Sequence, residues 1–233
     1  MKASLFLCFV IICPFLVVAQ TGKNPRVIRY FFHSHGISFQ NFPNLNARIQ
    51  SFPQYADLKK TTGTLEFGVI TKRNKTLILY NFITGSSLSG NKEKKSTATK
   101  FIGGSIDLGY NFLEKNNLSI YPFIGLGIVK YNVLLRKDNS SIPFDSVLQN
   151  SIVQQNVVPL TFNNNFLAYK TGIGINLKSA KHFRNSAGLQ MGYSGSFNES
   201  KWKVNSTQIL TNSPKDILSK FFLQINILYQ IRK

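Results

Sequence analysis

Cysteine, histidine and acidic residues are all scarce in this chain of 233 residues. It has two cysteines, three histidines and nine acidic residues, against 28 lysines and arginines. Both cysteines, Cys8 and Cys13, lie in an N-terminal segment that we expect to be removed, so the mature chain lacks disulfides and cysteine-based metal sites. Long apolar runs are absent after that segment, because the closest, residues 118–135, contains Pro122 and Gly125 and is rich in strand-forming residues.

The first twenty residues have the pattern of a secretory signal peptide. Lys2 supplies a positive charge, an apolar run extends from Leu5 to Val18, and Ala19 provides a small residue for cleavage. The run is shorter than the ~20 residues of a membrane-spanning helix, which leaves an uncleaved anchor as the alternative. We therefore expect residues 1–19 to be a signal peptide and residues 20–233 to form a single domain.

The basic residues give the chain a formal net charge of +19. A basic balance often indicates nucleic-acid binding, but here the cations gather at turns, such as Lys72, Arg73 and Lys75, and we expect the chain to be exported. Cations at the ends of membrane strands would meet anionic lipid headgroups and lipopolysaccharide, and solvated turn residues are the alternative. We expect lipid and lipopolysaccharide as partners, with other envelope proteins as further candidates, and no nucleic acid.

Apolar and polar residues alternate along much of the chain, which is typical of strands with two different faces. In the last segment, for example, Leu223 and Ile225 alternate with Gln224 and Asn226. The pattern predicts eight strands, at about 26–39, 62–72, 76–88, 97–112, 118–136, 164–178, 186–200 and 217–231. The fifth changes phase near Val129, which predicts a bulge.

Short and long connections alternate between these strands. The short ones are at 73–75, 113–117 and 179–185, and the others are at 40–61, 89–96, 137–163 and 201–216. In an up-and-down barrel, alternate connections lie at opposite ends, so the long ones would share one rim. Short periplasmic turns and long external loops are typical of outer-membrane barrels.

The two faces of the strands differ in side-chain size. One face is rich in Gly, Ser and Asn, which suit the cramped interior of an eight-stranded barrel, and the other carries bulky residues that would overfill it. A bulky apolar face that points outward requires lipid. The predicted fold class is all-β: an eight-stranded antiparallel up-and-down transmembrane β-barrel with short periplasmic turns and longer external loops. The alternative is a soluble, lipocalin-like barrel with its apolar face inward.

The alternating strands and the terminal strand at 221–229 resemble those of the small outer-membrane β-barrel proteins of Bacteroidota, the PorT-like and OmpA-like outer membrane protein β-barrel domain families. The resemblance extends over nearly all of the mature chain as a pattern, without a diagnostic motif. It implies a location in the bacterial outer membrane and no shared activity. The sequence differs from many such barrels at its C-terminus, where Tyr229, the last aromatic residue, is followed by Ile231, Arg232 and Lys233.

Histidines are the only candidates for a catalytic base. A hydrolase would need a nucleophile, a histidine and an acidic residue within reach of one another. His182 lies in a short basic turn, and His33 and His35 lie two residues apart on one face of the first strand, with no acidic residue before Asp57. We expect these histidines to fill polar or rim positions, and we predict no catalytic, cofactor-binding or metal site.

Carboxylates are informative because so few lie within predicted strands. Only Glu66 and Asp107 do, and because a carboxylate in lipid is unfavourable, each should point into the lumen and pair with a cation. The predicted lumen charge network consists of Glu66, Asp107, Lys100, Lys130, Lys170 and Lys220. It would act as a plug that holds the interior closed or, alternatively, as a gate that passes ions on opening. A wide pore is not expected in so narrow a barrel.

The external loops are the remaining place for function. In residues 41–58, Phe42, Leu45 and Ile49 are at helical spacing and predict a short helix that packs over one rim. The connection at 137–163 is long and rich in Asn, Gln and Ser. The favoured hypothesis is a structural or interaction protein that binds through its external loops, without catalytic activity or cofactors. The alternatives are a narrow channel or small-ligand transporter, and a lipid A-modifying enzyme.

Overall fold

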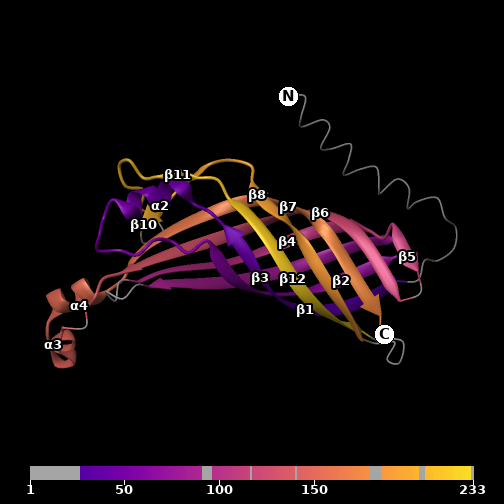
Figure 1. Ribbon diagram of the computed structural model, residues 1–233, viewed down its shortest axis with the longest axis horizontal. Helices are drawn as coiled ribbons and strands as arrows, with labels where there is room; N and C mark the ends of the chain where they lie inside the picture. The colour runs from indigo at the N-terminus through magenta and orange to yellow at the C-terminus, as the bar shows by residue number, and fades with distance from the viewer. Residues whose placement is uncertain are drawn as a thin grey trace.

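Eight long antiparallel strands form a closed barrel (Figure 1). The computed structural model describes residues 27–90, 96–115, 117–139, 141–178, 185–204 and 208–231. The strands are β1 (Val27–Gln40), β2 (Thr61–Arg73), β3 (Thr76–Gly90), β4 (Ser96–Tyr110), β6 (Leu118–Arg136), β7 (Leu160–Lys178), β8 (Asn185–Ser196) and β12 (Ser219–Ile231). Each pairs with the next of them along the chain, and β12 pairs with β1 to close the barrel. The predicted strands and their order are confirmed, whereas the predicted signal peptide lies outside the described residues.

One end of the barrel carries short connections. Asn74 and Lys75 alone join β2 to β3, and Asn74 has a φ of 55°, a left-handed conformation in which asparagine is enriched. Between β4 and β6 the chain forms only the short strand β5 (Leu113–Lys115), which pairs with β6. β1 begins and β12 ends at this same end. The predicted connection at 179–185 lies almost entirely outside the described residues.

The long connections gather at the opposite end, as the sequence predicts. The first contains helix α2 (Pro43–Gln50), and the third contains helices α3 (Phe144–Gln149) and α4 (Ser151–Val157), which lie beyond the barrel at the left of Figure 1. The fourth contains three two-residue strands: β9 (Ser200–Lys201), β10 (Lys203–Val204) and β11 (Lys215–Asp216). Within the described ranges, no helix is both long and apolar enough to cross a bilayer.

The bulky apolar face of the strands points away from the barrel axis. On β12, Phe221 and Ile225 are 60% and 61% exposed, whereas Gln224 and Asn226 on the inward face are each 1% exposed. The structure therefore excludes the alternative of a soluble barrel with its apolar face inward.

Two apolar clusters fill the ends of the interior and enclose a polar layer. The lower cluster lies at the short-turn end, and its buried members are Phe32, Ile70, Leu77, Leu79, Tyr121, Phe123, Phe222 and Leu228. The upper cluster lies next to the long connections, and its largest members include Phe42, Phe101, Tyr131, Phe166 and Trp202. The interior thus accommodates large rings, contrary to the expectation that bulky residues would overfill it.

Glycines on neighbouring strands make room for these rings. A Cβ atom at Gly174 would overlap the ring of Tyr121, and one at Gly192 would lie 2.7 Å from the Phe222 ring. Tyr121 is fully buried, and its hydroxyl accepts a 2.8 Å hydrogen bond from Gln190 Nε2. The frequent glycines of the inward faces are therefore a packing requirement of the aromatic interior.

β6 continues through Val129 without the predicted bulge. Its pairings with β4 and with β7 are uninterrupted on both sides of this residue. What changes is the chemistry of the inward face, because Gly125 and Gly127 border the polar layer whereas Val129 and Tyr131 belong to the upper cluster. The prediction was wrong because a change of composition along one face looks like a change of phase.

Helix α2 closes the upper end of the barrel. Leu45 and Ile49 on one side of the helix, and Phe42 just before it, are buried in the upper cluster. Pro43 begins the helix, a position where its missing N–H is not required. The predicted short helix over one rim is therefore confirmed.

Asp216 fastens α2 to the fourth long connection. Its carboxylate accepts hydrogen bonds from the backbone N–H groups of Asn44 and Leu45, at 3.0 and 3.1 Å, and from the indole of Trp202 at 2.8 Å. A carboxylate in this position complements the positive end of the helix dipole. Burial raises the pKa of the Asp216 carboxyl, and these three hydrogen bonds oppose the rise.

Substitution of Gly174 by alanine tests the packing of the aromatic interior. The new methyl group would displace the Tyr121 ring and break its hydrogen bond with Gln190, and overpacking of this kind costs about 1–3 kcal/mol. We expect Gly174→Ala to lower the urea midpoint of the purified barrel in detergent micelles. The control is Gly63→Ala, since the nearest atom to a Cβ there is 3.9 Å away. Equal midpoints for the two variants would contradict the packing account.

Candidate functional site

The middle of the interior contains four of the six residues of the predicted charge network. Glu66 on β2, Asp107 on β4, Lys170 on β7 and Lys220 on β12 all lie on inward faces. These strands are widely separated in sequence, and closure of the barrel brings their side chains together. The polar layer between the two apolar clusters is thus the candidate functional site of the interior.

Lys100 and Lys130 do not belong to this network, contrary to the prediction. On β4, Lys100 and Ile102 are two residues apart and point outward. Asp107 is an odd number of residues from both and therefore points inward. On β6, Lys130 is two residues after the outward Ile128 and points outward as well, whereas its neighbours Val129 and Tyr131 point inward. Both lysines therefore lie on the outer wall, next to the outward isoleucines on the side of the long connections.

Lys170 bridges the two buried carboxylates. Its Nζ atom is 3.2 Å from Glu66 Oε1 and 3.1 Å from Asp107 Oδ2. The side chains of Glu66 and Asp107 are 1% and 0% exposed, so each charge is removed from bulk water and depends on the lysine for compensation. We call this arrangement of Glu66, Asp107 and Lys170 the charge triad.

Neutral side chains complete the hydrogen bonding of the charge triad. Gln224 Nε2 donates to Glu66 Oε2 at 2.8 Å, and Asn81 Nδ2 donates to Asp107 Oδ2. The Lys170 ammonium group also lies 5.1 Å from the centre of the Phe222 ring, within the range of a cation–π interaction. Neither Asn81 nor Gln224 was predicted as part of the network, although both are polar and the alternation already placed Gln224 on the polar face of the last strand, which is the signal that could have found them.

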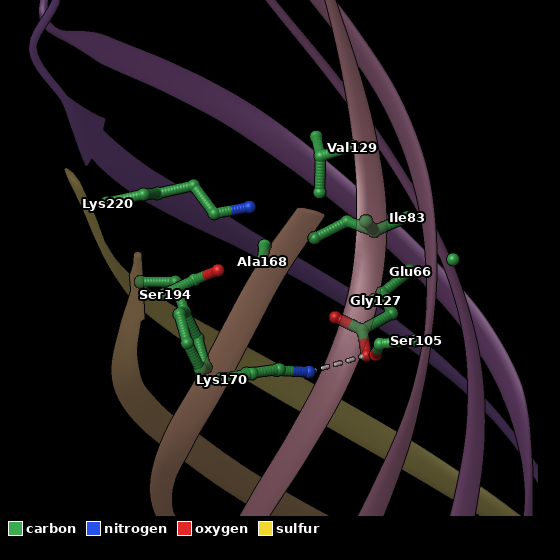
Figure 2. Close-up of a pocket in the computed structure, with 11 residues that line it drawn as sticks. Glu66, Ile83, Ser105, Gly127, Val129, Ala168, Lys170, Ser194 and Lys220 are labelled. Atoms are coloured by element: carbon green, nitrogen blue, oxygen red, sulfur yellow. Dashed lines mark hydrogen bonds and ion pairs between the residues drawn. The ribbon is translucent and has the colours of Figure 1, made fainter. Parts of the chain in front are cut away.

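Lys220 lies above the charge triad and faces the same small cavity. Figure 2 shows Lys220 and Lys170 extending into this space from one side, and Glu66 approaching from the other. The Lys220 ammonium group is 4.5 Å from the centre of the Phe101 ring. The cavity has a volume of about 30 Å³, which is enough for roughly two water molecules and too small for a sugar or nucleotide. With Lys220, two cations balance the two carboxylates of the polar layer.

His33 and His35 occupy neither interior nor rim positions. Both point outward from β1, with their ring centres 5.6 Å apart, and His33 stacks on Tyr229 of β12. Ser34 lies between them in the strand and Glu66 is its partner on β2, but both of these point inward and are buried. A Ser–His–acid arrangement would need all three on one face. His182 lies outside the described residues, among which no group of three or more potential metal ligands occurs.

The fold is similar to that of known outer-membrane barrels. No protein-family model matches the sequence, and no curated protein matches it. A major outer membrane protein of Thermus thermophilus is similar in structure with a TM-score of 0.51 at 10% identity, over 87% of this chain and 99% of that chain. The attachment invasion locus protein Ail of Yersinia pestis, solved with a heparin analogue, gives a TM-score of 0.49 at 12% identity, over 88% and 99% of the two chains. Neisserial surface protein A gives 0.44 at 11% identity, over 87% and 97%.

Removal of the Lys170 charge tests whether the charge triad holds the interior together. We expect Lys170→Met to destabilise the barrel by about 3–5 kcal/mol, because it removes the ammonium group that is ion-paired with both Glu66 and Asp107 and leaves these buried carboxylates without that partner. Urea unfolding of the purified protein in micelles measures the change.

A triple variant serves as the control for this prediction. Replacing Glu66 by Gln and Asp107 by Asn together with Lys170→Met removes the three charges of the triad and leaves Lys220 as the one charge of the polar layer, so we expect it to recover part of the lost stability. If the triple variant were no more stable than Lys170→Met, the loss would come from packing around the lysine stem and the role of the charges would be refuted.

Proposed function

We propose that the chain is an outer-membrane barrel with a sealed interior, which acts as a structural or interaction protein through its external segments. The observation that carries this proposal is the filling of the interior at three levels. The lower cluster, the charge triad and the upper cluster under α2 follow one another along the barrel axis. We expect no catalytic activity.

The apolar outer wall supports a location in the membrane. Large side chains such as Phe82, Ile106, Leu126 and Phe221 are exposed around the barrel, and so extensive an apolar surface requires lipid. Closure of β12 on β1 leaves no free strand edge between them to lie in the hydrocarbon. Cleavage of residues 1–19, and the narrower resemblance to PorT-like and OmpA-like barrels of Bacteroidota, are part of this proposal.

The third long connection is the external segment that we propose as the binding surface. Phe144 and Leu148 on α3 and Ile152 on α4 are 75%, 63% and 68% exposed, and Figure 1 shows both helices beyond the barrel end. The apolar residues of α2, in contrast, are buried in the upper cluster. Exposed apolar side chains on a segment remote from the barrel indicate a protein partner in the envelope rather than a contribution to stability.

Location is tested by membrane fractionation, followed by gel electrophoresis with and without boiling. We expect the protein in the outer-membrane fraction, and we expect the unboiled band to migrate faster because the closed barrel resists the detergent. A soluble periplasmic protein without a mobility shift would refute the membrane location.

Binding through the third connection is tested with a photo-reactive residue introduced at Phe144 or Leu148. Irradiation of living cells should give a discrete adduct with another envelope protein. The matched control is the same residue at Gln155, which is exposed on α4 and polar, and should give little adduct. Absence of adducts at every position of the connection, with normal protein in the outer membrane, would count against this segment as the binding surface.

A further inference from the structure

The outer wall changes from apolar to polar at one level on three adjacent strands. Along β4 the outward Ile102 is followed by Lys100, and along β6 the outward Ile128 is followed by Lys130. On β7 the outward, exposed Leu167 is followed toward the same rim by the exposed Asn165. This boundary lies on the side of the long connections, which the proposed function places outside the cell.

The strand register brings the two lysines together at this boundary. Lys130 pairs with Ile102 on β4 and with Asn165 on β7, and Lys100 pairs with Asn132 on β6. Lys100 and Lys130 are thus diagonal neighbours on one face, with their Cβ atoms about 7–8 Å apart. Two flexible side chains at this separation can direct their ammonium groups at one phosphate, and the asparagine amides can donate further hydrogen bonds.

An apolar groove lies directly below the two lysines. It forms at Gly104, whose lack of a side chain leaves a depression between its paired neighbours, Phe82 on β3 and Ile128 on β6. Ile106 and Leu126 line its other side, and from there the groove continues across β3 and β2 to Phe31 on β1, with a total volume of about 760 Å³. A Cβ atom at Gly104 would be 3.4 Å from its nearest neighbour, the carbonyl oxygen of Asn81, so a side chain there would make an ordinary van der Waals contact without a clash.

Cationic groups above an apolar groove are complementary to a lipid with an anionic headgroup. The charge of the lysines selects phosphate, and the groove below accepts an acyl chain that runs along the barrel wall. The order of the two along the wall, with the cations nearer the external rim, matches a lipid of the outer leaflet. A protein partner would be poorly matched by a groove that lies entirely on the lipid-facing wall.

We propose that Lys100, Lys130 and the groove at Gly104 form a binding site for one phosphorylated lipid of the outer leaflet, of the lipid A class. The inference rests on the proposed membrane location and adds to it a ligand with a defined position. Lys100 and Lys130 hold the phosphate, and the groove holds one acyl chain.

The headgroup contact is tested by titration of the purified barrel in detergent micelles with lipid A that carries two phosphates, followed by native mass spectrometry. We expect Lys100→Gln/Lys130→Gln to weaken lipid A binding at least tenfold. The control is Lys59→Gln/Lys60→Gln, which removes two exposed charges from the first long connection and should leave binding unchanged. With dephosphorylated lipid A, all three proteins should bind alike.

The acyl contact is tested by filling the groove. We expect Gly104→Leu to weaken binding of both the phosphorylated and the dephosphorylated lipid, because the new side chain occupies the path of the chain. Gly63→Leu is the control, since Gly63 is also outward and a Cβ there meets open space.

The outcomes separate the site from the proposed membrane location. A protein that shifts on unboiled gels and binds lipid A equally well in the lysine variant and in Gly104→Leu would overturn the site and leave the location intact. A protein that fails to fold into micelles or to reach the outer membrane would overturn the proposed location, and the site with it. Weakening by loss of any two lysines, including Lys59 and Lys60, would show attraction by net charge and would also overturn the site.

Discussion

The ion pairs of Lys170 with Glu66 and Asp107 are the interaction on which the interior of this barrel depends. A buried carboxylate is tolerated only with a partner, and here one cation on β7 pairs across the lumen with two carboxylates, from β2 and β4. The apolar clusters above and below separate the triad from bulk water and so increase its dependence on the lysine. Because the triad occupies the middle of the lumen, the three residues that neutralise each other's charge also obstruct the path through the barrel.

Because the interior is filled, the surfaces that can bind a ligand or a partner are the outer wall and the long connections. The outer wall presents exposed apolar residues, and Lys100 and Lys130 follow the outward isoleucines on β4 and β6. The long connections divide into two kinds. The first long connection is fastened to the fourth by Asp216 and to the barrel interior by the buried Leu45 and Ile49, whereas the third carries exposed apolar side chains. The first thus closes the barrel, and the third is available to a partner.

Much of the fold could be predicted because alternation of polarity reports directly on strands and on their faces. The spacing of Phe42, Leu45 and Ile49 predicted helix α2 in the same way. The charge network was predicted only in part. The alternation along β4 could have placed Lys100 on the outward face with Ile102. The face of Lys130 was harder to predict, because the composition of the inward face of β6 changes at Val129. The hydrogen bonds of Asp216 with Asn44 and Leu45 could not be predicted, because they join segments more than 170 residues apart whose proximity follows from barrel closure.

The most direct test of a sealed interior is the conductance of the purified, refolded barrel in a planar lipid bilayer. The account predicts no discrete current steps for the wild-type protein at neutral pH, because the charge triad and both apolar clusters obstruct the lumen. It also predicts that insertion itself is detectable, since the protein should remain protected from protease in the same lipid. Reproducible single-channel steps whose size changes on replacement of Lys170 or Asp107 would show that ions pass through the triad, and would contradict the account.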